Sequence, residues 1–162
     1  MFQVIFTVIS VIGASLHLAF SPERRSSGVA IAQTYLLYLL FFYVGLMGTL
    51  TAYAHVFRPV ETSASIGWST SPYEYEVGMA DLTVGVLGIL CLKFRANFWL
   101  ATAIANAVWL LGDAVGHARQ MILNNNHAAN NSGIFLATEI IMPLVILSLT
   151  LYYRRSCKIA SQ

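Results

Sequence analysis

Five long apolar stretches alternate with short polar segments along the 162-residue chain. A helix needs roughly 20 apolar residues to cross about 30 Å of hydrocarbon. The stretches therefore predict an all-α membrane protein, a five-transmembrane-helix bundle that uses the whole chain, 1–162, as one domain. The predicted helices cover residues 2–20, 30–56, 72–92, 97–122 and 132–153.

Two proline positions mark expected helix boundaries. Arg58-Pro59 is expected to end the second helix, which leaves residues 58–71 as a loop. Ser71-Pro72-Tyr73-Glu74 has the pattern of a capping box with proline at the first helical position, so it predicts the start of the third helix.

The few charged residues separate by side once the five helices are threaded through a bilayer. Seven of the nine Lys and Arg fall on one side: Arg24, Arg25, Lys93, Arg95, Arg154, Arg155 and Lys158. Six of the seven acids fall on or just inside the other side: Glu61, Glu74, Glu76, Asp81, Asp113 and Glu139. Because basic residues favour the cytoplasmic side, this separation predicts an outer N-terminus and a cytoplasmic C-terminus.

Composition narrows the class of protein further. The chain is 57% hydrophobic and only 10% charged, which excludes a soluble domain. No basic residue precedes the first apolar stretch, so we expect a retained helix and no secretory signal peptide. The basic residues are short pairs beside helices, so the net charge of +2 gives no reason to expect a nucleic-acid partner.

Polar residues follow one face of the fourth predicted helix: Thr102, Asn106, Asp113, Gly116, His117 and Gln120. Lipid cannot satisfy these groups, so the face must meet other helices or a hydrated cavity. Counting about 1.5 Å per residue along each helix predicts that four helices bring one set of titratable residues to a common level in the outer half of the bundle: His55, Asp81, Asp113, His117 and Glu139.

Small residues on the predicted helices indicate close helix packing. Gly45 and Gly48 lie on the second helix, and the third helix carries Gly78, Gly85 and Gly88. On the fourth helix, Gly112 and Gly116 have the GxxxG spacing beside Asp113, so we expect another helix to approach there.

Several kinds of functional site could be built from the titratable residues at this level. A metal site would draw on Asp113, His117 and Glu139, with Asp81 and His55 nearby, although the Glu-x-x-His pairs of di-iron bundles are missing. A haem held by His55 and His117, a proton-linked cavity for a small solute, and a purely structural ion pair stay open as alternatives. Since no nucleophile motif or phosphate loop is present, the sequence does not predict an enzyme acting alone.

Three segments carry a family resemblance: YEVGMADLTVGVLGILC, FWLATAIANAVWLLGDAVGHARQM and GIFLATEIIMP. They resemble an uncharacterised family of small bacterial integral-membrane proteins, over roughly residues 66–146. The residues that match the family pattern are Glu76, Gly85, Gly88, Gly116, His117 and Gln120. The pattern usually has Pro-Gly where this chain has Ala129-Asn130. A fainter likeness to the DoxX-type membrane proteins rests on EVGMADLTVGVLGIL alone.

These observations predict a multi-pass protein of the bacterial inner membrane. We expect a His/carboxylate site that faces outward and takes a proton, a metal ion or a small ligand. The candidate site residues are Asp113, His117, Asp81, Glu139, His55, Glu76 and Gln120. The alternative is a structural accessory subunit of a larger redox or oxygenase complex, in which the bilayer, other membrane subunits or further copies of the chain are the partners.

Overall fold

The computed structural model describes residues 2–159, without the side chains of Lys158 and Ile159. The side chain of Lys158, predicted to lie on the basic side, is outside the described part of the structure. The described chain is helical and contains no strand. Its elements are α1 (Phe2–Phe20), η1 (Pro22–Arg25), α2 (Gly28–Tyr38), η2 (Leu39–Met47), α3 (Gly48–Phe57), α4 (Pro59–Ile66), α5 (Tyr73–Leu90), α6 (Asn97–Asn124) and α7 (Ile134–Ile159).

Among the described residues, four helices are long and apolar enough to cross a membrane: Phe2–Phe20, Gly28–Phe57, Asn97–Asn124 and Ile134–Cys157. The second of these joins α2, the π-helical segment η2 and α3 into one rod. The 18-residue α5 carries three acidic residues and is not among the four. A fifth crossing by α5 therefore stays a prediction.

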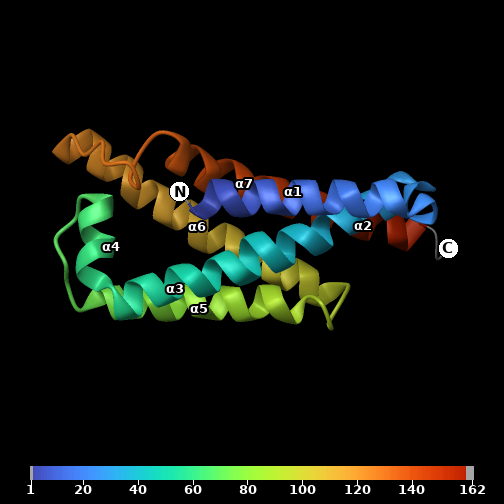
Figure 1. Ribbon diagram of the computed structural model, residues 1–162, viewed down its shortest axis with the longest axis horizontal. Helices are drawn as coiled ribbons and strands as arrows, with labels where there is room; N and C mark the ends of the chain where they lie inside the picture. The colour runs from blue at the N-terminus through green and yellow to red at the C-terminus, as the bar shows by residue number, and fades with distance from the viewer. Residues whose placement is uncertain (1, 160–162) are drawn as a thin grey trace.

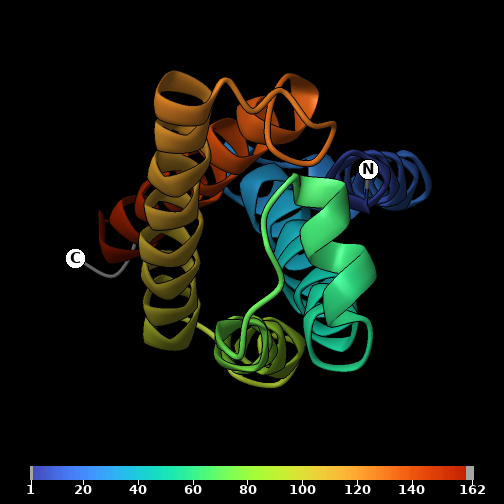
Figure 2. The ribbon, with the colours of Figure 1, turned by 90° about the vertical axis from the view of Figure 1, so that its left-hand side faces the viewer.

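α1, α5 and the rod that joins α2 to α3 run along the longest dimension of the molecule, and α6 crosses them obliquely (Figure 1 and Figure 2). One end carries α4 and the loop that joins α6 to α7, and the other carries η1 and the end of α7 (Figure 1). The most extensive packing joins α5 to α3 and η2, and α6 to α7. Seen from the α4 end, α5 and α6 meet only along part of their length (Figure 2).

Large side chains fill the centre of the bundle around η2. Leu40, Tyr43 and Val44 from η2 are buried with Trp99 of α6 and Ile146 of α7. The indole Nε1–H of Trp99 donates to the backbone carbonyl of Cys91 at 2.9 Å, which satisfies the polar atom of this buried ring. Trp99 therefore fixes the turn between α5 and α6 against the core.

Glycines allow the backbone of α5 to touch the rod formed by η2 and α3, as the sequence predicts. A Cβ on Gly88 would meet backbone atoms of Leu40 and Gly45, and a Cβ on Gly48 would lie 3.1 Å from the Cα of Gly85. A Cβ on Gly78 would lie 3.2 Å from the carbonyl oxygen of Ala52. The two helices can approach this closely only because glycine has no side chain.

Gly112 and Gly116 behave differently from the prediction. Within the described chain nothing lies within 4 Å of a Cβ placed on Gly112, and the nearest atom to one on Gly116 belongs to Trp68, at 3.7 Å. The reason is geometric, since α6 uses another face to pack against α7. Gly112 therefore faces open space and Gly116 faces the indole of Trp68, so no helix packs closely against the GxxxG pair in the described chain.

Residues 58–71 are not simply a loop. Pro59 begins α4 because a proline in the first turn of a helix loses no hydrogen bond there. Gly67 follows the helix with φ of +77°, the left-handed conformation that favours glycine at a helix end. The pKa of the Glu61 carboxyl lies below its usual value for two reasons. Its own backbone N–H donates to the carboxylate, and the guanidinium of Arg58 donates to Oε1 of Glu61 at 2.9 Å.

Replacing two glycines by alanine tests this packing with a matched control. Gly88→Ala should lower the free energy of unfolding by about 1–3 kcal/mol, because the new methyl group meets backbone atoms that cannot move aside. Gly112→Ala should leave it unchanged or raise it by about 0.5–1 kcal/mol, since its methyl group meets nothing and alanine favours the helix. Reversible unfolding in one detergent measures both, and equal effects would contradict the packing described.

Candidate functional site

Helices α6 and α7 bring three of the predicted site residues together. The Nε2 atom of His117 lies 3.7 Å from Oδ2 of Asp113 and 3.8 Å from Oε2 of Glu139. One ligand atom from each residue lies within 4.8 Å of the other two. Asp113 and His117 are one helical turn apart on α6, and the packing of α7 against this face supplies Glu139.

The three side chains differ in how much of their surface is exposed. The side chains of His117 and Glu139 are 3% and 2% exposed, whereas that of Asp113 is 33% exposed. The cluster therefore has a closed side formed by two buried residues and an open side at Asp113. Interactions in the closed side are little screened by solvent, so each polar atom there needs a partner.

The ring of His117 is held by Asn131, from the loop that joins α6 to α7. The Nδ2 atom of Asn131 donates to two backbone carbonyls, those of His117 at 3.3 Å and Asn126 at 2.9 Å, which identifies its Oδ1 as the acceptor. This Oδ1 lies 2.8 Å from Nδ1 of His117 and also accepts from Nε1–H of Trp68 at 3.1 Å. An amide oxygen cannot donate, so Nδ1 of His117 carries the hydrogen and Nε2 of the neutral ring has a lone pair.

Aromatic rings close the space around His117. The ring of Trp68 lies 5.2 Å from the imidazole, centroid to centroid, and that of Phe135 meets it edge-on at 5.3 Å. Trp68 comes from the segment between α4 and α5, and Phe135 from the start of α7. The imidazole is thereby fixed on three sides, and Nε2 points to the carboxylates.

The carboxylate of Glu139 has one satisfied oxygen and one that lacks a partner. Its Oε1 accepts from Nε2–H of Gln3 at 3.1 Å, and the hydroxyl of Thr138 donates to Oε1 of Gln3 at 2.6 Å. Its buried Oε2, which faces His117, has no hydrogen-bond partner among the described residues. A buried carboxyl oxygen in this state calls for a proton, a water molecule or a cation beside it.

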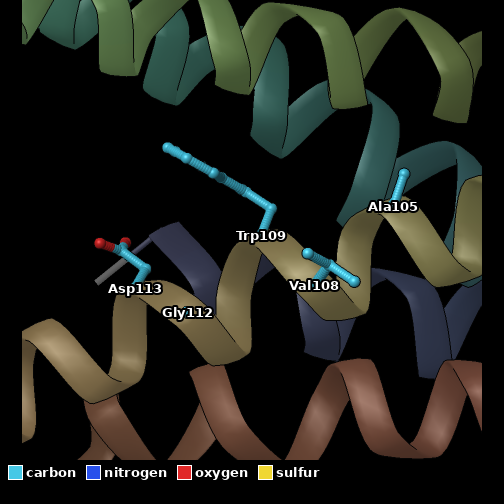
Figure 3. Close-up of a pocket in the computed structure, with 5 residues that line it drawn as sticks. All are labelled: Ala105, Val108, Trp109, Gly112 and Asp113. Carbon is cyan, nitrogen blue, oxygen red and sulfur yellow. The ribbon is translucent and has the colours of Figure 1, made fainter.

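Asp81 lies beside this cluster on α5. Its Oδ1 accepts from Nε1–H of Trp109 at 2.8 Å, and Asp81 is near enough to Asp113 and His55 to interact with them electrostatically. Trp109 and Asp113 also line a groove of about 570 Å³ together with Ala105, Val108 and Gly112. Their side chains point from α6 into the space below α5 (Figure 3).

His55 is engaged elsewhere. Its Nδ1 lies 2.7 Å from Oε2 of Glu74, an ion pair that joins α3 to the first turn of α5. Glu74 therefore makes no capping box: α5 begins after Pro72, and no side chain caps its first turn. A buried carboxylate is stabilised more by the imidazole of His55 than by a hydrogen bond from one backbone N–H. Glu74 therefore contacts His55 and does not form the predicted capping box.

Two further predicted residues lie apart from the cluster. Glu76 is exposed on α5. Gln120 accepts a hydrogen bond from Asn124 at 2.5 Å and lines a separate, polar hollow with Trp68 and Asn126. The structure thus brings Asp81, Asp113, His117 and Glu139 together, and leaves Glu76, Gln120 and the His55–Glu74 pair around them.

Sequence reasoning missed four residues that organise the site: Gln3, Trp68, Trp109 and Asn131. Gln3 offered a signal, because it is an amide within an apolar stretch and such a group needs a buried partner. Trp68 and Trp109 gave no signal, because tryptophans in a membrane protein are typical of interface anchors and packing. Asn131 is one of several asparagines in its loop, and nothing in the sequence distinguishes it from the others.

The chain belongs to a family of unknown function, DUF6790, whose family model matches residues 1–158. This confirms the expected membership of an uncharacterised family. No curated protein and no solved structure is significantly similar to the chain. The bacterial origin and the fainter DoxX-type likeness stay predictions.

Replacing Asn131 tests the orientation of His117. In the unchanged protein, ¹⁵N NMR of labelled histidine should show hydrogen on Nδ1 of His117, because Oδ1 of Asn131 is an acceptor. Asn131→Ala should remove this fixed form. Asn124→Ala, in the same segment but bonded only to Gln120 among the described contacts, should preserve it. A ring with hydrogen on Nε2 and none on Nδ1 in the unchanged, metal-free protein would contradict the assignment.

Proposed function

We propose that this protein is an integral membrane protein that binds one divalent transition-metal ion, of the zinc class, through Asp113, His117 and Glu139. The observation that carries the proposal is the buried Oε2 of Glu139, which has no hydrogen-bond partner among the described residues and faces Nε2 of His117. With hydrogen on Nδ1, Nε2 presents a lone pair to two carboxylate oxygens. Three electron-rich atoms that converge in a buried site favour a cation between them.

The distances also support an ion. Hydrogen bonds between nitrogen and oxygen are about 2.7–3.2 Å long, whereas Nε2 of His117 lies 3.7 and 3.8 Å from the two carboxylate oxygens. Ligands about 2.0–2.2 Å from one tetrahedral ion are separated by roughly 3.3–3.6 Å. Small movements of these side chains would complete such a site, with two carboxylates balancing the charge of the ion.

The donor set narrows the kind of ion. One imidazole nitrogen with carboxylate oxygens suits zinc and its first-row neighbours better than calcium, which prefers six to eight oxygen ligands. The hydrogen bond that Nδ1–H of His117 donates to Asn131, and the one that Gln3 donates to Glu139, hold the two buried ligands in place. Such partners orient ligands and sustain affinity in known metal sites. A haem between His55 and His117 fits less well, because Nε2 of His117 already faces two carboxylates.

Three protein ligands leave at least one position at the ion for water or another ligand. Because Asp113 is the ligand with an exposed side chain, this open position lies toward the groove. We therefore favour an exchangeable ion, as in uptake, sensing or delivery, over a permanently enclosed structural one. The role as an accessory subunit of a larger complex stays a prediction.

The proposal places five helices across the bacterial inner membrane, with α5 as the fifth crossing. Two of the acids of α5 have partners inside the bundle, Glu74 with His55 and Asp81 with Trp109. Glu76 lies in the first turn, where it remains close to the membrane surface. In this orientation α4 is outside and the end of α7 is cytoplasmic, as the basic residues favour.

Metal binding can be measured on tag-free protein with two matched variants. The unchanged protein should bind about one Zn²⁺ per chain. Glu139→Gln should weaken binding by about 100-fold or more, since it removes a charged ligand and keeps the shape of the side chain. Glu76→Gln, an exposed acid outside the cluster, should bind as before.

The stability of the metal-free proteins separates a binding site from a structural ion pair. Glu139→Gln should raise the Tm of the metal-free protein, because an uncompensated buried charge is lost, and should abolish the further rise that Zn²⁺ gives the unchanged protein. Equal zinc binding by the Glu139→Gln and Glu76→Gln variants, or none by the unchanged protein, would refute the proposal.

Cysteine labelling tests the orientation. Cys157, exposed near the end of α7, should react with a membrane-impermeant maleimide only after cells are made permeable. In a Cys157→Ser background, Ser69→Cys, in the segment after α4, should react in intact cells. The reverse pattern would show that the chain is inserted the other way round.

A further inference from the structure

The three proposed ligands differ in how an ion can reach them. His117 is enclosed by Asn131, Trp68 and Phe135, and Glu139 is covered by Gln3 from α1. Asp113 alone among the ligands has a side chain that is one-third exposed. An ion must therefore approach the site past Asp113, from the side of the groove.

The groove provides the space for this approach. Its lining residues, from Ala105 to Asp113, occur three or four positions apart and so lie on one face of α6. At Gly112, next to Asp113, a side chain would meet nothing within 4 Å in the described chain. Figure 3 shows Trp109 and Asp113 projecting from this face into the space between α6 and the helices opposite.

Asp81 adds a second carboxylate near the groove, beside that of Asp113. It lies on α5, across from α6, and Nε1–H of Trp109 holds its carboxylate at 2.8 Å. His55 also interacts electrostatically with Asp81, but its Nδ1 is engaged by Glu74, so Asp81 has no ion pair with a basic side chain among the described residues. Two carboxylates beside a low-dielectric wall concentrate cations and speed their association.

We propose that the groove along this face of α6 is the access route of the metal ion, and that Asp81, on α5 beside Trp109, attracts the ion and passes it to Asp113. This inference rests on the metal site proposed above and adds two residues to it that are not ligands. Asp81 is a steering residue, and Gly112 keeps the route open. Neither is needed to hold the ion once it is bound.

Stopped-flow binding of Co²⁺ tests the route, because Co²⁺ replaces zinc and its visible absorption reports the bound ion. Gly112→Phe should slow association and dissociation by a similar factor, about tenfold or more, and leave the Kd unchanged, since an obstacle on a path affects both directions. Ile104→Phe adds the same ring at an exposed position of α6 outside the groove and should have no effect.

Asp81→Asn provides an independent measurement. It should reduce the association rate by roughly three- to tenfold and make that rate less sensitive to ionic strength, as expected for the loss of a steering charge. The absorption spectrum of bound Co²⁺ should stay the same, because the ligands are unchanged. A merely structural role of Asp81 would alter affinity or spectrum and leave the salt dependence intact.

The outcomes separate the two proposals. Unchanged association rates in both Gly112→Phe and Asp81→Asn, with Co²⁺ bound normally, would overturn the access route and leave the metal site standing. A changed Co²⁺ spectrum in Asp81→Asn would identify Asp81 as a ligand and overturn its steering role. Absence of Co²⁺ binding by the unchanged protein would overturn both proposals.

Discussion

The approach of Nε2 of His117 to the buried carboxylate of Glu139, at 3.8 Å, is the contact on which the account of this protein depends. Neither atom has a hydrogen to offer the other when the ring is neutral, since Asn131 fixes the hydrogen on Nδ1. Removing a carboxylate from water costs several kcal/mol unless a positive group compensates it. A metal ion between the two atoms would compensate this cost, and Asp113 would complete the proposed site for it.

The helix packing explains how such a site is kept in place. Glycines let α5 lie directly against η2 and α3, and a separate pairing joins α6 to α7. The cluster belongs to the second pair, and Gln3 of α1 braces it from a third helix. Because α5 touches α6 only in part, a groove remains beside Asp113. The same packing therefore gives the site a rigid closed side and an open one.

Local patterns in the sequence predicted the parts of this structure that depend on one helix or on depth alone. The four-residue spacing of Asp113 and His117 placed them on one face, and counting residues along α7 placed Glu139 near their level. The partners that complete the site come from distant segments: Gln3 from α1, Trp68 from the loop before α5, and Asn131 from the loop after α6. Their roles depend on tertiary contacts that no periodicity encodes. Glu74 shows the same limit, because its local pattern favoured a cap while the contact with His55 prevailed.

X-ray absorption spectroscopy of the zinc-loaded protein in lipid is the most direct test of the central claim. The metal-site account predicts one imidazole nitrogen and two or three oxygens at about 2.0–2.2 Å, with the imidazole signal lost in His117→Ala. A spectrum with oxygen ligands alone, or one that His117→Ala leaves unchanged, would contradict an ion shared by His117 and the two carboxylates.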